Sequence, residues 1–126
     1  MLFDTDLFIW VQRGNLHAAK VMNETVERYL SVQTYMELLQ SAGNKNQIFL
    51  VKRFIYDMGF RVLPLTENIG HRALIYVEEY GLSSGMRAGD AIIAATAVEN
   101  NMLLMTSNAK HFSVITDLQL KIFKPS

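Results

Sequence analysis

Short apolar segments alternate with helix-like segments along the whole chain, and this alternation constrains the fold more than any other feature. Strand-like runs bounded by polar turns occur at residues 1–4, 28–32, 61–64, 102–106 and 119–123. Strands that alternate with helices favour an α/β fold with a mainly parallel sheet. These strands are too few and too short for a barrel, so we expect a single-domain, three-layer α/β/α fold with about five strands.

The segments between the strands have the spacing of helices. They cover residues 7–12, 15–22, 34–42, 46–58, 67–80 and 90–99. Residues typical of helix ends flank them: Thr34 and Glu37 at capping-box spacing, Thr66 as an N-cap, and Gly59 and Gly81 as stops. The last segment, DAIIAATAVE, is apolar on nearly every side and is therefore predicted to be a buried helix.

Composition narrows the functional classes. The 126 residues suit one domain, 1–126, and the absence of cysteine excludes disulfides, zinc–thiolate sites and thiol nucleophiles. Twelve basic and twelve acidic residues cancel, so a nucleic-acid function must rest on local positive patches or on a metal inside an acidic site. Acids occur from position 4 and no apolar run reaches the ~18 residues of a membrane span, so we expect a soluble, cytoplasmic protein.

Acidic residues follow three of the predicted strands or open the helices after them. Asp4 follows the first strand, Glu37 lies in the first turn of the predicted helix after the second, and Asp90 opens the buried helix. In an open parallel sheet, ligands bind outside the carboxyl ends of the strands. We therefore expect these carboxylates along one edge of the sheet, although each taken alone is also an ordinary cap or turn residue.

Further polar residues belong to the same predicted edge. Asp6 follows Asp4 closely, and Thr106 and Asn108 follow the strand NMLLM. Clustered carboxylates repel one another unless a cation neutralises them or one stays protonated. Oxygen ligands favour Mg²⁺ or Mn²⁺, and such ions commonly activate water and stabilise charge in phosphate-ester hydrolysis. Metal-dependent phosphoester hydrolysis is therefore the predicted chemistry.

The whole chain, in order, resembles the PIN-domain ribonucleases, in particular the VapC-type toxins of bacterial and archaeal toxin–antitoxin pairs. The similar segments are LFDTDLFI, VQTYMELLQ, AGDAIIAATAVENNMLLMTSNAKHF and LQLKIF. The resemblance implies that Asp4, Glu37 and Asp90 hold one or two Mg²⁺ or Mn²⁺ ions, and that water hydrolyses phosphodiesters of single-stranded or looped RNA. It also implies a homodimer that a cognate antitoxin inhibits by covering the site.

The chain departs from the family pattern after the fourth strand. Many members carry an acid just after the threonine, where this chain has Ser107 and Asn108, and some carry an acid where it has His111. We expect the Asn108 carbonyl, the Thr106 hydroxyl and the charge of Asp6 to substitute for that acid. His111 itself is expected to be a surface or packing histidine.

Two further features are candidates for contacts with RNA or a partner. Arg87 and Lys110 flank the site segments and are candidates for phosphate contacts, the alternative being solvated surface cations. The stretch QIFLVKRFIYDMGF carries Phe49 and Leu50 beside its core-facing set, more apolar side chains than one buried face needs. It is a candidate partner surface, and burial in the core is the alternative.

Three other functions remain open from the sequence. DTD after an apolar strand resembles the nucleophile motif of haloacid-dehalogenase-type phosphatases, with Asp4 as nucleophile and Asp6 as acid/base, but this leaves Glu37 without a role. A receiver domain would use the same pair, but its third strand needs a phosphoacceptor aspartate, and RVLPLTEN offers only Glu67. The third alternative is a catalytically degenerate PIN domain that binds RNA or protein without cleavage.

Overall fold

The computed structural model describes residues 1–126 and contains one five-stranded sheet. The strands are β1 (Leu2–Phe3), β2 (Tyr29–Ser31), β3 (Arg61–Leu63), β4 (Leu104–Thr106) and β5 (Leu120–Ile122). Their order is β3-β2-β1-β4-β5, and every neighbouring pair is parallel. All five predicted strands are confirmed, and the α/β class with them.

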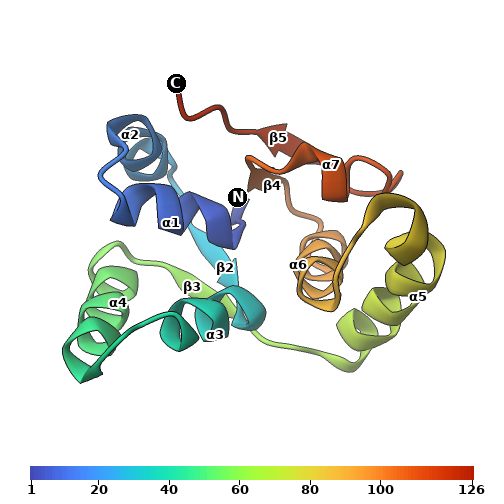
Figure 1. The fold of residues 1–126 in the computed structure, drawn as a ribbon, viewed down its shortest axis with the longest axis horizontal. Coiled ribbons are helices and arrows are strands. Elements are labelled where there is room, and N and C mark those ends of the chain that lie inside the picture. The colour runs from blue at the N-terminus through green and yellow to red at the C-terminus, as the bar shows by residue number, and fades with distance from the viewer.

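Seven helices surround the sheet. They are α1 (Thr5–Gln12), α2 (Leu16–Glu24), α3 (Val32–Gln40), α4 (Lys45–Asp57), α5 (Glu67–Ser84), α6 (Ala88–Glu99) and α7 (Ala109–Phe112). Helices α1 to α4 lie on one side of the sheet, and α5 and α6 lie together on the other (Figure 1). The short α7 has no counterpart among the predicted helices. None of the helices combines the length and the apolar composition of a membrane span.

Successive residues of the central strands point into two separate cores. Leu2 packs with α5 and α6, whereas Phe3 packs with α1 to α4, and Leu104 and Met105 divide in the same way. Since Leu2 pairs with Leu104 and Phe3 with Met105, the register places like-facing side chains side by side. The sheet is therefore the middle of three layers, as the sequence predicts.

The connections of the sheet diverge between its two central strands. From β1 the chain passes through α1 and α2 to β2 on one side, while β4 pairs with β1 on its other side. Ligand sites in open α/β sheets occur at such switch points, outside the carboxyl ends of the strands. Asp4 directly follows β1 and Ser107 directly follows β4, so both lie at this position.

Several helix boundaries differ from the prediction by one to four residues, and at two of them the predicted end signal is wrong. The N-cap of α3 is Ser31, whose Oγ accepts a hydrogen bond from the Thr34 amide at 3.0 Å, so the predicted capping box of Thr34 and Glu37 is wrong. Glu37 consequently lies in the second turn of α3 and is free to face another element. The predicted stop at Gly81 is also wrong, because α5 continues to Gly85, which ends it with a φ of +75°.

Candidate active site

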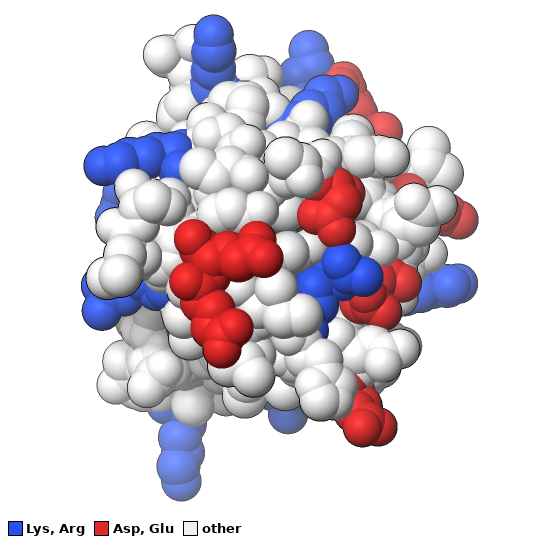
Figure 2. Space-filling view, turned by 90° about the vertical axis from the view of Figure 1, so that its right-hand side faces the viewer, with Lys and Arg blue, Asp and Glu red and all other residues white.

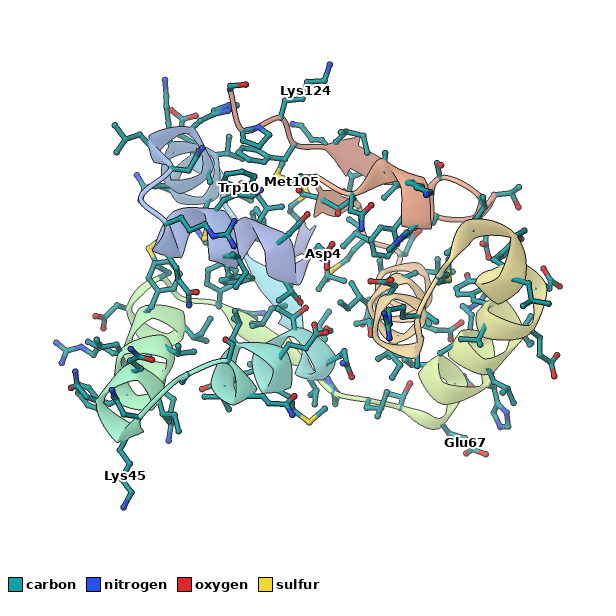
Figure 3. All side chains as sticks on the ribbon, viewed as in Figure 1. Asp4, Trp10, Lys45, Glu67, Met105 and Lys124 are labelled. Carbon is teal, nitrogen blue, oxygen red and sulfur yellow. The ribbon has the colours of Figure 1, made fainter.

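Asp4 lies at the centre of the site, where β1 ends and α1 begins (Figure 3). Only 6% of Asp4 is exposed. Its Oδ1 accepts a hydrogen bond from the Thr5 amide at 2.8 Å, and its Oδ2 accepts one from the Thr106 hydroxyl at 2.7 Å. The Asp4 amide also donates to the Met105 carbonyl at 2.9 Å, so β4 holds both the backbone and the carboxylate of Asp4.

Asp6 is the second residue of α1, and its carboxylate is hydrogen-bonded to the residue that follows β4. Its Oδ2 accepts hydrogen bonds from the amide of Ser107 at 2.9 Å and from the hydroxyl of the same residue. The Thr106 hydroxyl is 3.4 Å from this oxygen. The other carboxylate oxygen, Oδ1, is buried and has no hydrogen-bond partner. The two acids of the DTD motif are therefore not equivalent, although both face the same strand end.

Glu37 reaches the start of α1 from the middle of α3. Its Oε1 accepts a hydrogen bond from the Thr5 hydroxyl at 2.5 Å, and this hydroxyl also lies 3.0 Å from the Thr34 hydroxyl. On its other side, Glu37 lies against Gly89 of α6, where a Cβ atom would come within 3.2 Å of Oε2. Glu37 is thus enclosed between α1 and α6.

Asp90 is the third residue of α6 and contacts the segment after β4. Its Oδ2 accepts a hydrogen bond from the Arg87 amide at 3.3 Å and lies 3.0 Å from Nδ1 of His111. Asn108 lies beside this pair, and its side-chain Nδ2 is 3.1 Å from the same ring nitrogen. The backbone amide of Asn108 donates to the Thr106 hydroxyl at 3.0 Å. His111, expected to be a surface or packing histidine, is partly buried, and its ring contacts the carboxylate of Asp90.

The structure therefore places all predicted acids and their supporting residues around the ends of β1 and β4. The predicted phosphate-binding cations Arg87 and Lys110 border this region, are exposed, and take part in none of the ion pairs. Sequence reasoning missed Thr5 and His111. Two sequence features could have pointed to them: Thr5 lies between the two acids of the DTD motif, and His111 stands where some family members carry an acid.

Asp4 is the acid whose protonation the site perturbs most clearly. Burial, and after it the charge of Asp6, raises the pKa of Asp4 to about 7, with Asp90 adding in the same direction. The hydrogen bonds from Thr106 and Thr5 oppose this rise because they favour the ionised form. Without a compensating cation, the site therefore resists carrying its full negative charge.

The oxygen atoms of the site side chains fit a hard divalent cation. The buried, unpartnered oxygen of Asp6 and the raised pKa of Asp4 both mark negative charge without a counterion. The carboxylate, hydroxyl and amide oxygens are of the type that Mg²⁺ and Mn²⁺ prefer. No three acidic or histidine side chains are gathered closely enough to ligate one ion together. Mg²⁺ commonly retains several waters and binds through one or two carboxylates.

A separate groove lies between α1, α3 and α4. It has a volume of about 440 Å³, and apolar side chains dominate its lining, among them Phe8, Leu38, Leu50 and Phe54. Along α4, Phe49 is 56% exposed and Leu50 is 54% exposed. The extra apolar residues of the segment 47–60 are therefore on the surface, not in the core.

Comparisons with known proteins agree with this architecture. The family model described as the PIN domain matches residues 1–118. A toxin–antitoxin complex from Klebsiella pneumoniae contains a chain that is 26% identical, with a TM-score of 0.78 over 99% of this chain and 97% of the other.

Two further solved structures share the fold. VapBC-1 from nontypeable Haemophilus influenzae is 24% identical, with a TM-score of 0.75 and 96% of each chain covered. DNA-bound VapBC from Salmonella typhimurium is 20% identical, with a TM-score of 0.79 and 96% of each chain covered. No curated protein matches the chain at a significant level.

Proposed function

The chain belongs to the PIN domain family, and on this premise we propose that it is a metal-dependent endoribonuclease, the toxin of a type II toxin–antitoxin pair. One observation carries the proposal most directly. The acids that follow β1, Asp4 and Asp6, are both bonded to the residues that end β4, at the switch point of the sheet. Glu37 and Asp90 border the same point from α3 and α6.

Each side chain has a distinct role in this proposal. Asp4, Glu37 and Asp90 hold one or two Mg²⁺ or Mn²⁺ ions, while the hydroxyls of Thr5 and Thr106 orient the carboxylates of Glu37 and Asp4. When bound, the cation supplies activation of water and stabilises charge on the phosphate oxygens. The exposed cations Arg87 and Lys110 contact neighbouring phosphates of the RNA, which is single-stranded or looped.

The surface supports a local mode of RNA binding. On the face that carries α5, acidic side chains gather near the middle and most basic side chains lie toward the margins, without a continuous basic surface (Figure 2). The net charge of zero also argues against binding by bulk electrostatics. RNA contact is therefore proposed at the cation-binding edge and its bordering Arg87 and Lys110, not across a broad basic face.

A cognate antitoxin is the proposed partner, since the similar Klebsiella pneumoniae chain is part of a toxin–antitoxin complex. The apolar groove between α1, α3 and α4 is of a size and composition that suit an apolar segment of such a protein. We also propose a cytoplasmic homodimer. The exposed Leu74, Ile75 and Leu82 on α5 support self-association.

The phosphatase and receiver readings are set aside, because the family and the site geometry both disagree with them. Both mechanisms would leave Glu37 without a role, although its carboxylate accepts a hydrogen bond from the hydroxyl of Thr5, the residue that follows Asp4. A degenerate PIN domain remains the second candidate. The observation that favours it is Asn108, which stands where many family members carry an acid and directs its side chain toward His111.

Cleavage of RNA by the purified chain tests the proposal. We expect Mg²⁺- or Mn²⁺-dependent cleavage that is lost in Asp90→Asn, a variant of equal size, and inhibition by the antitoxin. Asp57→Asn is the matched control, since this exposed carboxylate of α4 pairs only with Arg53. Absence of cleavage with every RNA offered, while Mn²⁺ binds, would favour the degenerate binding module.

A further inference from the structure

The ring of His111 contacts the carboxylate of Asp90, at a position where some members of the family carry an acid in place of the histidine. Its Nδ1 lies 3.0 Å from Oδ2 of Asp90, a residue 21 positions earlier, and links α7 to the first turn of α6. Both side chains are largely buried, with exposed fractions of 27% for His111 and 23% for Asp90. The contact is therefore not a surface ion pair between mobile side chains.

The two neighbours of Nδ1 determine where the imidazole carries its proton. An ionised carboxylate only accepts hydrogen bonds, so the contact with Asp90 requires a proton on Nδ1. The structure places Nδ2 of Asn108, a donor, 3.1 Å from the same nitrogen. A proton on Nδ1 therefore requires the Asn108 side-chain amide to turn its carbonyl oxygen toward the ring. In that orientation of the Asn108 amide, a single Nδ1–H serves two acceptors, the carboxylate of Asp90 and the carbonyl of Asn108.

We propose that His111 is a positioning residue that holds Asp90 in the orientation needed to bind the divalent cation. This inference rests on the proposed function. The Oδ2 atom of Asp90 accepts from both His111 and the Arg87 amide, whereas no protein donor contacts Oδ1. Oδ1 is therefore the oxygen available to the cation. Hydrogen bonds of this kind to ligating carboxylates orient them and increase metal affinity.

The geometry separates this role from two others. A side chain that only packs α7 against α6 would act through its volume, and a direct metal ligand would act through an unprotonated ring nitrogen. A positioning donor acts through an N–H group at the place of Nδ1. Asparagine carries its amide N–H at the same number of bonds from the main chain as Nδ1, whereas glutamine carries it one bond further away.

The test compares His111→Asn with His111→Gln in Mn²⁺ titrations by calorimetry. We expect His111→Asn to bind Mn²⁺ nearly as well as wild type, and His111→Gln to lose affinity by about 10- to 100-fold, the range typical of lost outer-shell partners. Thermal melts without metal identify any variant that fails to fold. His71→Gln is the matched control, and its affinity should not change, because this exposed histidine of α5 pairs with Glu67 outside the site.

Equal loss of Mn²⁺ affinity in both variants, or no loss in His111→Gln, would overturn the positioning role. The proposed function would still stand if the wild-type protein binds Mn²⁺ and cleaves RNA. Failure of wild type to bind Mn²⁺ and to cleave RNA would instead overturn the proposed function, and this inference with it. Electron spin-echo spectroscopy of bound Mn²⁺ adds an independent readout. A nitrogen coupling that disappears in His111→Asn would show direct ligation and contradict our proposal.

The protonated nitrogen can be observed without any metal. Nitrogen-15 NMR of the neutral ring distinguishes its two tautomers. We expect the proton on Nδ1 of His111. A proton on Nε2 would overturn the inference, because Asp90 would then face a lone pair.

Discussion

The hydroxyl of Thr106 donates a 2.7 Å hydrogen bond to Oδ2 of Asp4, across 102 positions of sequence. This bond joins the carboxyl ends of β1 and β4, the two strands between which the connections of the sheet diverge. It also fixes the carboxylate that the rest of the site surrounds.

The raised pKa of Asp4 predicts that the metal-free protein loses stability as the pH rises from about 4 to about 7. Across this range the unfolded chain ionises Asp4 while the folded chain keeps it protonated, because burial and Asp6 raise its pKa from 3.8 to about 7. The loss is at most roughly 4 kcal/mol. We expect Asp4→Asn to abolish this part of the pH dependence in urea denaturation, whereas Asp57→Asn retains it.

Binding of Mn²⁺ should reverse this destabilisation. At 100-fold excess over its Kd, a ligand of the folded state alone adds about 2.7 kcal/mol, so the melting temperature of wild type should rise. Glu37→Ala and Asp90→Ala should fold, lose the rise and lose RNA cleavage, since each removes a proposed ligand. Identical melting shifts in wild type and both variants would show that these carboxylates share no metal site.

Gly89→Ala should separate activity from stability. A Cβ atom at this position would lie 3.1 Å from Nε2 of Gln33 and 3.2 Å from Oε2 of Glu37, so the Glu37 carboxylate must shift. We expect about 10-fold slower cleavage from this misplacement. Alanine also favours helix formation, so stability should rise by about 0.5–1 kcal/mol.

Gly70→Ala is the matched control for that substitution. Gly70 lies in α5, and a Cβ atom there meets nothing within 4 Å. The same helical gain, without any change in cleavage rate, is expected from denaturation and activity measurements. Slower cleavage in both variants would remove the steric explanation.

Asp6 should compensate for the acid that Asn108 replaces. The carboxylate of Asp6 is anchored by Ser107, at the start of the segment that contains Asn108. We expect Asp6→Asn to lower Mn²⁺ affinity about 10-fold, as loss of an outer-shell group does. Asn108→Asp should restore part of it in the double mutant, measured as a double-mutant cycle. An additive result, without rescue, would exclude compensation.

Arg28 should stabilise the layer that contains α2 and α4. Its guanidinium donates three hydrogen bonds of 2.7 Å, to the carbonyls of Met22, Asn23 and Met58 near the ends of these helices. We expect Arg28→Met to lower the free energy of unfolding by about 2–3 kcal/mol. Arg53→Met removes only an exposed i,i+4 pair with Asp57 and should cost about 0.5 kcal/mol or less.

Local sequence patterns determined those strands and helices whose signals, apolar runs or helical spacing, lie within the segment itself. The strands ending at Phe3 and Thr106 follow from apolar runs, and the buried α6 follows from its small apolar residues. The parallel order then predicted that acids after separate strands meet at one edge. Asp4 and Asp90 were therefore predicted to lie at the same edge of the sheet, and in the structure the charge of Asp90 acts on Asp4.

Only the tertiary structure decided the contacts made across the layers. The start of α3 at Ser31 leaves Glu37 to accept from Thr5, 32 residues earlier, and the position of α7 brings His111 to Asp90. A helical or strand period has a range of a few residues, whereas these bonds depend on the register of parallel strands and the packing of helices over them. The types of chemical group were thus present in the sequence, but their pairing required the fold.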